Sequence, residues 1–195
     1  LYLCRHGDTA WSGQRRLVGR NDVPLVAAGE QNARRLGDRL RTVAFERVLV
    51  SPLGRARRTA ELAGFGAAQV DERLLEMDFG LYEGRTVEEI RRDQPGWTYL
   101  RDLCPGGEGP DDIGRRADDL LADLESTSGD VVLFGHSVIL RVVAARFLGL
   151  SPDAGRLLML APGALSILGY DHVVDARAIA VWNDRAHLSS ESAFA

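Results

Sequence analysis

Cysteine is scarce in this sequence, with Cys4 and Cys104 the only two among 195 residues. They form no Cys-x-x-Cys spacing, which argues against a zinc ribbon or a thiol redox motif. Two cysteines in a chain of this length do not make a disulfide framework either. The default expectation is therefore a protein of the reducing cytoplasm. We expect Cys4 to be a packed strand residue without reactivity of its own.

Long hydrophobic runs are also missing. No apolar stretch reaches the roughly 18 residues of a membrane span, so we expect no membrane partner. Internal repeats and low-complexity linkers are absent, and the length suits one domain over residues 1–195. The chain opens on Leu1 rather than methionine. We therefore expect native residues before it, and a removed signal peptide stays open.

Lysine is absent, so the 24 positively charged side chains are all arginine. They cluster in the first sixty residues. Arginine favours planar, bidentate recognition of phosphate or carboxylate, although high-GC codon usage gives the same bias. The net charge of −4 and the pI near 5.6 argue against general nucleic-acid binding.

Strand and helix patterns alternate along the chain. In the helix expected over 51–64, Ser51 is predicted to cap the start and Gly64 to mark the end. The expected helices cover 27–42, 51–64, 111–126 and 138–148, and the expected strands cover 1–4, 45–50, 130–135, 164–170 and 176–183. This alternation predicts an α/β fold, a three-layer sandwich with a mostly parallel central sheet flanked by helices.

Charged and titratable side chains follow three of these strands. Arg5 and His6 come after the first strand, Arg55 comes after the strand at 45–50, and His136 ends the segment "DVVLFGH". Ligands of such sheets bind beyond the carboxyl ends of the strands. If the three strands are neighbours, one pocket collects two histidines and at least two arginines.

Such a pocket suits either a metal ion or a phosphate. The two histidines with Asp8 or Glu76 would make a zinc set. However, Arg5 and Arg55 would repel a divalent cation, so we expect neither a metal nor an organic cofactor. Arginine forks bind phosphoryl oxygens, and a neutral imidazole can attack phosphorus. Gly7 lets the chain bend so that a nearby carbonyl holds the other ring nitrogen as a donor.

Five ordered segments then carry a resemblance that spans residues 1 to about 141. They are "RHGDT", "GRNDVPLVAAGEQNARRL", "VLVSPLGRARRTAEL", "LLEMDFGLYEG" and "GHSVILR". Together they resemble the histidine phosphatase superfamily, in the branch that includes the cofactor-dependent phosphoglycerate mutases, and the fold implied is phosphoglycerate-mutase-like. One such segment is a weak signal, whereas five in order are specific.

The resemblance implies a role for each matching side chain. His6 matches the histidine that becomes phosphorylated, and Glu76 matches the proton donor. Asp78 is a rival donor, because residues two apart share a face of an extended segment. The side chains implied to contact the phosphoryl group or substrate are Arg5, Thr9, Ser12, Arg55 and His136. The sequence departs from the usual family pattern at Asp8, Ser12, Ser137, Val138 and Gly109, and none of these changes removes a catalytic group.

The implied activity is hydrolysis of small phosphomonoesters through a phosphohistidine at His6. The expected partner is a small phosphorylated metabolite, and a homodimer is allowed. One alternative is a cofactor-dependent phosphoglycerate mutase, which shares the catalytic residues. We expect the short chain to leave a more open site, which favours hydrolysis. The other alternative is a signalling phosphatase or binding module for phosphorylated proteins.

Residues 77–110 are the expected lid over the substrate, or else peripheral packing. Trp97, Tyr99 and Cys104 lie in this stretch. A shallow pocket without the region around Trp97 would favour the signalling alternative. His172 and His187 are isolated late in the chain, and we expect both at the surface.

Overall fold

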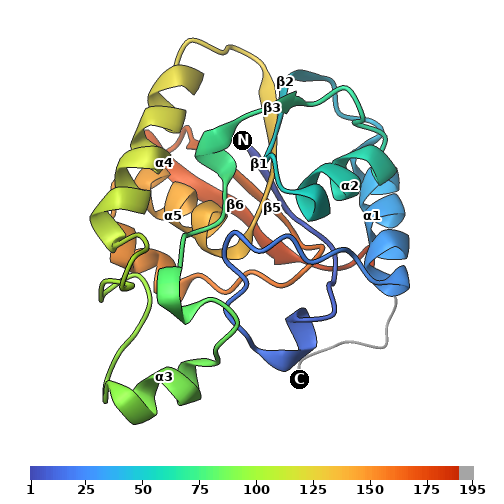
Figure 1. The fold of residues 1–195 in the computed structure, drawn as a ribbon. Coiled ribbons are helices and arrows are strands. Elements are labelled where there is room, and N and C mark those ends of the chain that lie inside the picture. The colour runs from blue at the N-terminus through green and yellow to red at the C-terminus, as the bar shows by residue number, and fades with distance from the viewer. Residues whose placement is uncertain (189–195) are drawn as a thin grey trace.

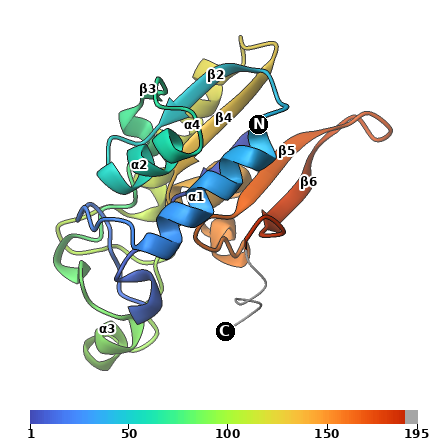
Figure 2. The same ribbon diagram turned by 90° about the vertical axis from the view of Figure 1, so that its right-hand side faces the viewer.

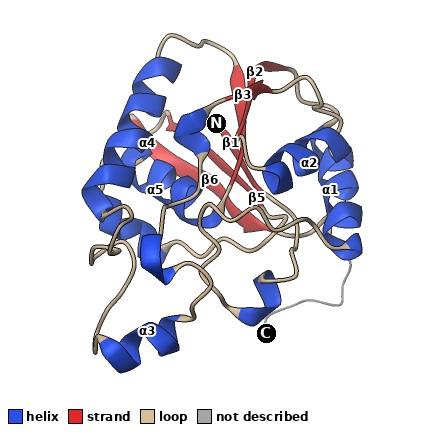
Figure 3. Cartoon of the chain, in the orientation of Figure 1, coloured by secondary structure: helices blue, strands red, loops and turns tan. Residues whose placement is uncertain are grey.

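The computed structural model describes residues 1–188 and contains a six-stranded sheet with helices on both faces (Figures 1 and 3). The strands are β1 (Tyr2–Arg5), β2 (Phe45–Val50), β3 (Gln69–Val70), β4 (Asp130–Gly135), β5 (Leu165–Asp171) and β6 (Ala176–Asp184). The helices are α1 (Ala27–Leu40), α2 (Gly54–Leu62), α3 (Val87–Asp93), α4 (Pro110–Leu124) and α5 (Ser137–Phe147).

The strand order is β3-β2-β4-β1-β5-β6. The pairs β3–β2, β2–β4 and β4–β1 are parallel, whereas β1–β5 and β5–β6 are antiparallel. The sheet is therefore mixed but mostly parallel, and the predicted fold class is confirmed. The β5–β6 hairpin extends beyond the helical layers (Figure 2).

Alternating side chains of the central strands fill two cores. Leu3 and Leu49 pack with residues of α4 and α5, whereas their neighbours Cys4 and Val50 pack with residues of α1 and α2. Successive side chains of a strand point to opposite faces, so a run such as "VLV" has to be apolar throughout when helices cover both faces. Figure 1 shows these two helix pairs on opposite sides of the sheet.

Most of the predicted elements are present, with ends shifted by a few residues. The expected strand at 45–50 matches β2, and "DVVLFG" matches β4. The prediction for Ser51 was wrong: α2 begins at Gly54, and Ser51 does not cap it. Instead the carboxylate of Asp22, from a distant loop, accepts from the Gly54 N–H at 2.6 Å. A cap supplied from another part of the chain leaves no local sequence signal.

The parallel strands β2, β4 and β1 are direct neighbours, as the sequence argument required. Their carboxyl ends therefore lie at the same edge of the sheet, and the segments "SPLGR", "GHS" and "RHG" meet there. Helix α3 and strand β3 were not predicted, because both are short. Within residues 1–188, no helix is long and apolar enough to cross a bilayer.

Candidate active site

The predicted site residues gather around a cavity of about 290 Å³ at the carboxyl ends of β1, β2 and β4. We call it the carboxyl-end cavity. His136 lies next to it, with its ring centroid 5.2 Å from that of His6. The predicted residues that line the cavity are Arg5, His6, Ser12, Arg55 and Glu76.

His6 is buried, and its ring has a defined orientation. Its Nδ1 lies 2.7 Å from the carbonyl oxygen of Gly7. A carbonyl can only accept, so Nδ1 carries the hydrogen and Nε2 keeps its lone pair. Burial, together with the positive charges of Arg5 and Arg55, holds the pKa of His6 well below 6.5. The neutral ring therefore offers a free nitrogen nucleophile at neutral pH.

Position 7 requires a glycine, because the backbone of Gly29 leaves no space for a side chain there. A Cβ at Gly7 would lie 2.5 Å from the carbonyl oxygen of Gly29, at the start of α1. The Gly7 N–H also donates to the Thr59 hydroxyl of α2 at 3.1 Å. The carbonyl predicted to hold the His6 ring is that of Gly7 itself, and α1 and α2 fix the peptide that carries it.

Two arginines frame the His6 ring from different elements. Arg55, in the first turn of α2, is 1 % exposed. Its Nη1 and Nη2 donate to the carbonyls of Asn21 and Gly19 at 2.5 and 2.7 Å. Arg5 donates from Nη1 to the Leu160 carbonyl at 2.5 Å, and burial lowers its pKa to about 10. Both guanidinium groups stay charged at neutral pH.

Each of these two arginines has an N–H group that donates to no other described residue. The Nε atoms of Arg5 and Arg55 are buried and have no hydrogen-bond partner within residues 1–188. A buried donor without a partner is costly unless something else accepts from it. The arrangement therefore provides fixed positive charge and free N–H groups for an anion beside His6.

His136 follows β4 and directly precedes α5, and its side chain is fully buried. Its Nε2 lies 2.7 Å from the hydroxyl of Ser51, while its Nδ1 has no partner within the described chain. The Leu53 N–H reaches the same Ser51 oxygen at 3.4 Å. That contact uses one of the two lone pairs of Ser51, and its O–H is free to donate to His136.

The direction of the hydrogen bond with Ser51 decides the tautomer of His136. If Ser51 donates to Nε2, the hydrogen of the neutral ring sits on Nδ1. Burial, followed by the charge of Arg55, holds the pKa of His136 well below 6.5, so the ring is neutral. Its Nδ1–H is then a second free donor next to His6. Ser51 was not among the predicted site residues, because the sequence pattern indicated a helix cap at this position.

Glu76 is buried against the start of α5. Its Oε1 accepts from the N–H groups of Met77, Val138 and Ile139 at 3.0–3.1 Å, whereas Oε2 accepts only from Val138 at 3.1 Å. The carboxyl group is thus positioned by backbone, and Oε2 is the less occupied oxygen. Among the two candidate proton donors, Glu76 lines the carboxyl-end cavity.

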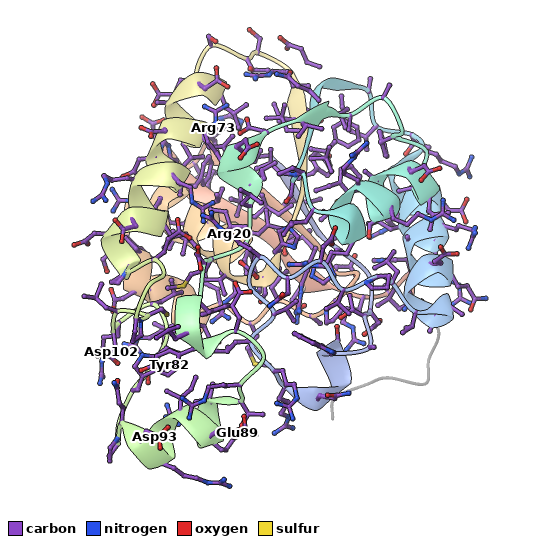
Figure 4. The ribbon with its side chains drawn as sticks, viewed as in Figure 1. Arg20, Arg73, Tyr82, Glu89, Asp93 and Asp102 are labelled. Atoms are coloured by element: carbon purple, nitrogen blue, oxygen red, sulfur yellow. The ribbon has the colours of Figure 1, made fainter. Side chains whose placement is uncertain are left out.

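Asp78 does not line that cavity. Its Oδ1 accepts from the Gly80 N–H at 2.8 Å, and its Oδ2 lies 3.6 Å from Nε of Arg20. Arg20 is labelled near the centre of Figure 4. The expectation that both carboxylates point into the same pocket is therefore wrong, because contacts with Gly80 and Arg20 hold Asp78 outside it.

Arg116 of α4 holds the segment that carries Glu76. Its Nη1 donates to the carbonyls of Arg73 and Leu75, both at 2.8 Å. Its Nε is paired with Glu108 at 2.8 Å. Arg73 itself lies beside α4 (Figure 4). Its Nη2 pairs with the carboxylate of Asp123 at 2.9 Å. These contacts between distant segments had no signal in the local sequence.

The remaining predicted residues have mainly supporting positions. Thr9 is buried and pairs with Ser12, with 3.1 Å between the two hydroxyl oxygens.

Cys4 is fully buried, and burial raises the pKa of its thiol, which agrees with an unreactive strand residue. His172 is exposed as expected. The expectation for His187 was wrong, because it is half-buried and lies 2.9 Å from the Gly163 carbonyl.

The region 77–110 contributes one wall of the cavity. Tyr82, Glu89, Asp93 and Asp102 mark this region in Figure 4. Trp97 is buried against Tyr82, with ring centroids 5.1 Å apart, so it packs inside the region. The residues of this region that line the cavity are Phe79, Val87 and Tyr99.

Within the described residues, no group of three or more His, Cys, Asp or Glu side chains is placed to hold a metal ion. The arrangement instead combines a neutral imidazole nucleophile, two arginines, a second imidazole donor and a positioned carboxyl group. These groups can bind and transfer a phosphoryl group.

Comparison with known proteins agrees with this chemistry. Residues 1–185 match the family model described as the histidine phosphatase superfamily, branch 1. A Salmonella choleraesuis protein called "Probable phosphoglycerate mutase GpmB" is 34 % identical over 183 residues, which cover 87 % of this chain and 84 % of that protein.

Solved structures give the same answer for the fold. The product of open reading frame Rv3214 from Mycobacterium tuberculosis has a TM-score of 0.88 and 33 % identity, covering 93 % of this chain and 95 % of that one. A mycobacterial glucosyl-3-phosphoglycerate phosphatase has a TM-score of 0.83 and 27 % identity, covering 94 % and 98 %.

Proposed function

We propose that this chain, which belongs to the histidine phosphatase superfamily, hydrolyses small phosphomonoesters through a phosphohistidine at His6. The observation that carries the proposal is the state of the His6 ring. Its Nδ1–H is held by the Gly7 carbonyl, and the neutral ring presents Nε2 at a cavity flanked by Arg5 and Arg55. An unprotonated nitrogen beside fixed positive charge suits attack on phosphorus.

In the first step, Nε2 of His6 attacks phosphorus, and the N–P bond forms as the bond to the leaving oxygen breaks. Charge on the three equatorial oxygens is stabilised by Arg5, Arg55 and the Nδ1–H of His136. Glu76 gives a proton to the leaving oxygen, which departs as an alcohol. Oε2 is the oxygen suited to carry that proton, since Oε1 already accepts three N–H groups.

In the second step, a water molecule attacks the phosphohistidine. Glu76 takes a proton from the water, the N–P bond breaks, and inorganic phosphate leaves. His6 returns to its neutral state and Glu76 is protonated again, so the cycle consumes only ester and water. The steps need no metal ion or organic cofactor.

Trapping of the intermediate tests the proposal. Rapid quench without acid, after mixing with a phosphorus-labelled substrate, should leave label on His6, since phosphohistidine is lost in acid. His6→Ala should lose turnover by about 10⁴-fold or more, because no neighbouring side chain can replace the nucleophile. His172→Ala, at an exposed histidine, is the matched control. Label on another residue, or near-normal activity of His6→Ala, would refute the mechanism.

Phosphoglycerate mutase activity is the second candidate, and the name of the Salmonella relative favours it. The alignment covers most of that relative, so chain length does not separate the two activities. We expect phosphate release to exceed transfer within 3-phosphoglycerate. Efficient isomerisation in the presence of a bisphosphoglycerate primer would reverse this assignment.

A signalling or binding role is less well supported. It would be favoured by a shallow pocket without the region around Trp97. That region is present, and Tyr99 from it lines the carboxyl-end cavity. A cavity of about 290 Å³ suits a small molecule better than a protein surface.

A further inference from the structure

Three carboxylates lie close enough to Arg55 to act on its charge, and one of them has no role in the chemistry described so far. Burial lowers the pKa of Arg55, and the carboxylates of Glu76, Asp22 and Glu83 oppose this lowering. Glu76 is the proposed proton donor, and Asp22 caps α2. Glu83 is the carboxylate whose purpose is unassigned.

Arg55 takes its orientation from a loop that is distant in the chain. Its Nη1 and Nη2 donate to the carbonyls of Asn21 and Gly19, and within residues 1–188 no other group accepts a hydrogen bond from this guanidinium group. The carboxylate of Asp22 lies farther away, at 3.6 Å from Nη1. The position of the two carbonyl oxygens therefore sets the direction in which the free Nε–H of Arg55 points beside His6.

The backbone at 19–21, which we call the 19–21 loop, belongs to no helix or strand. Gly19 has a φ of +56°, in the left-handed region that favours glycine. A Cβ at Gly19 would lie 2.0 Å from Oε1 of Glu83. Position 19 therefore has no space for a side chain, because a carboxylate from another part of the chain packs directly against it.

The half-buried carboxylate of Glu83 holds this loop through three donors. Its Oε1 accepts from the N–H of Arg20 at 2.7 Å, and its Oε2 accepts from the N–H of Asn21 at 3.2 Å. The side-chain Nδ2 of Asn21 donates to the same Oε2 at 2.5 Å. Two successive backbone N–H groups that converge on one anion form a nest, which is a favourable site for negative charge.

One peptide group links Glu83 directly to Arg55. The carbonyl of Gly19 and the N–H of Arg20 belong to the same planar peptide group, and they point in opposite directions because the bond is trans. Glu83 binds the N–H of this peptide, and Arg55 binds its carbonyl. An anion at the N–H also polarises the peptide and makes its carbonyl a stronger acceptor.

Backbone contacts fix Glu83 itself relative to the 19–21 loop. The N–H of Gly84 donates to the carbonyl of Leu17 at 2.7 Å, and the N–H of Leu17 donates to the carbonyl of Arg85 at 2.9 Å. The segment that follows Glu83 is thus hydrogen-bonded to the segment that precedes the loop. Glu83 does not line the carboxyl-end cavity, so it can act on a substrate only through its neighbours.

We propose that Glu83 is a positioning residue for the reaction, which fixes Arg55 beside His6 through the 19–21 loop. This rests on the proposed function, which places the phosphoryl group between Arg55 and His6. The region 77–110 therefore supplies a second contribution to the site besides its cavity wall. It controls the orientation of a phosphoryl-binding arginine from outside the cavity.

Glu83→Gln tests the proposal with little change in side-chain size. One acceptor oxygen becomes an NH2 group, which cannot accept from the N–H groups of the loop. The kcat for p-nitrophenyl phosphate should fall roughly tenfold, because a displaced Arg55 stabilises the transition state less well. Asn21→Ala removes only the side-chain donor to Glu83, so it should cause a smaller loss of kcat in a protein with less disturbance of its fold.

Asp102→Asn is the matched control in the same region (Figure 4). Asp102 is also half-buried and accepts from a backbone N–H, that of Thr98, at 2.7 Å, but it makes no contact with the 19–21 loop. Urea unfolding will show whether this variant is destabilised. Its kcat should nevertheless equal that of the wild type, since Arg55 keeps its two carbonyl acceptors.

A double-mutant cycle separates positioning of Arg55 from a general structural role. In an Arg55→Ala background, Glu83→Gln should lower kcat/KM for p-nitrophenyl phosphate no further, because no guanidinium group is left to orient. A structural role would give the same loss in both backgrounds. That result, or a wild-type kcat in Glu83→Gln, would overturn the proposal.

Failure of the proposed function would look different, since the wild-type protein would then release no phosphate from p-nitrophenyl phosphate. Calorimetric titration of inorganic phosphate would still test Glu83. Weaker binding to Glu83→Gln than to wild type and Asp102→Asn would support the positioning role. Equal binding to all three proteins, or no binding to the wild type, would refute it.

Discussion

The two ends of the sheet carry cavities of opposite character. At the amino ends of β1 and β4, a cavity of about 510 Å³ is lined mainly by apolar residues, by backbone and by a few exposed charges such as Glu125. We call it the amino-end cavity. The carboxyl-end cavity is smaller, at about 290 Å³, but it is lined by His6 and five arginines. Size alone would therefore select the end of the sheet opposite to His6.

The difference follows from the parallel strands. At their carboxyl ends the chain leaves β1, β2 and β4 into turns and helix starts, where polar side chains and backbone N–H groups converge. At the amino ends no comparable convergence of buried charge occurs in the described chain. Chemical reactivity is therefore expected at one end only, and substitutions at the two ends should differ sharply.

The largest effect beyond loss of His6 should come from the proton donor. Glu76→Gln should lower kcat on an alkyl phosphate by about 10²–10⁴-fold, because an alkoxide is a poor leaving group without a proton. The same variant should lose far less on p-nitrophenyl phosphate, whose phenolate leaves readily. Parallel assays of the two esters measure this contrast.

Asp78→Asn is the matched control for that contrast, since Asp78 lies two residues away but outside the cavity. It should change activity little on either ester. If Asp78→Asn shows the leaving-group dependence and Glu76→Gln does not, the carboxyl group has been misassigned.

The next-largest loss of kcat should come from substitution of Ser51, which positions the ring of His136. Ser51→Ala removes the donor to Nε2, so the ring no longer has one enforced tautomer, and kcat should fall roughly tenfold to hundredfold. Nitrogen-15 NMR of the His136 ring should show the hydrogen on Nδ1 in the wild type and a mixture in Ser51→Ala. Ser51→Thr keeps the hydroxyl, so it should have near wild-type kcat and show the hydrogen of His136 on Nδ1. An unchanged tautomer in Ser51→Ala would remove Ser51 from the mechanism.

A smaller effect concerns acid stability. Both His6 and His136 have a folded pKa well below 6.5, so below pH 6.5 the unfolded chain binds protons that the folded chain does not. Their contribution to the free energy of unfolding is complete above pH 6.5 and decreases as the pH falls. Each histidine should cost about 1.4 kcal/mol per pH unit below that point, while its folded form stays neutral.

Urea unfolding at pH 7.0 and pH 5.5 measures this loss. His6→Gln should lose less stability between the two values than the wild type does, because one buried neutral histidine is gone. His172→Gln, at an exposed histidine, should behave as the wild type. Identical pH dependence in His6→Gln and wild type would show that His6 is not held neutral by the fold.

The smallest effect is expected in the amino-end cavity. Glu125 lines that cavity and lies 3.7 Å from Arg177. Glu125→Gln should leave kcat/KM within about twofold of the wild type, because surface ion pairs contribute little and the site is at the other end of the sheet. A large loss of activity would break the comparison and indicate that the two ends are coupled.

The sequence by itself determined the order of the longer strands and helices along the chain, the mostly parallel sheet, and the convergence of Arg5, Arg55 and His136 beside His6. The physical reason is periodicity: strands covered on both faces are apolar throughout, and helices repeat their apolar positions every three to four residues. The polar segments that interrupt these patterns then fall at the carboxyl ends of the strands. Local sequence was sufficient for these predictions because each pattern lies within one stretch of consecutive residues.

Only the tertiary structure decided how those residues are held and which neighbours complete them. Ser51 contacts His136 instead of capping α2, Asp22 caps that helix from a distant loop, and Asp78 turns away from the cavity that Glu76 lines. Arg141 reaches the same cavity from the second turn of α5. These contacts join residues far apart in the chain, so their geometry depends on packing between elements, which no local pattern of residues encodes.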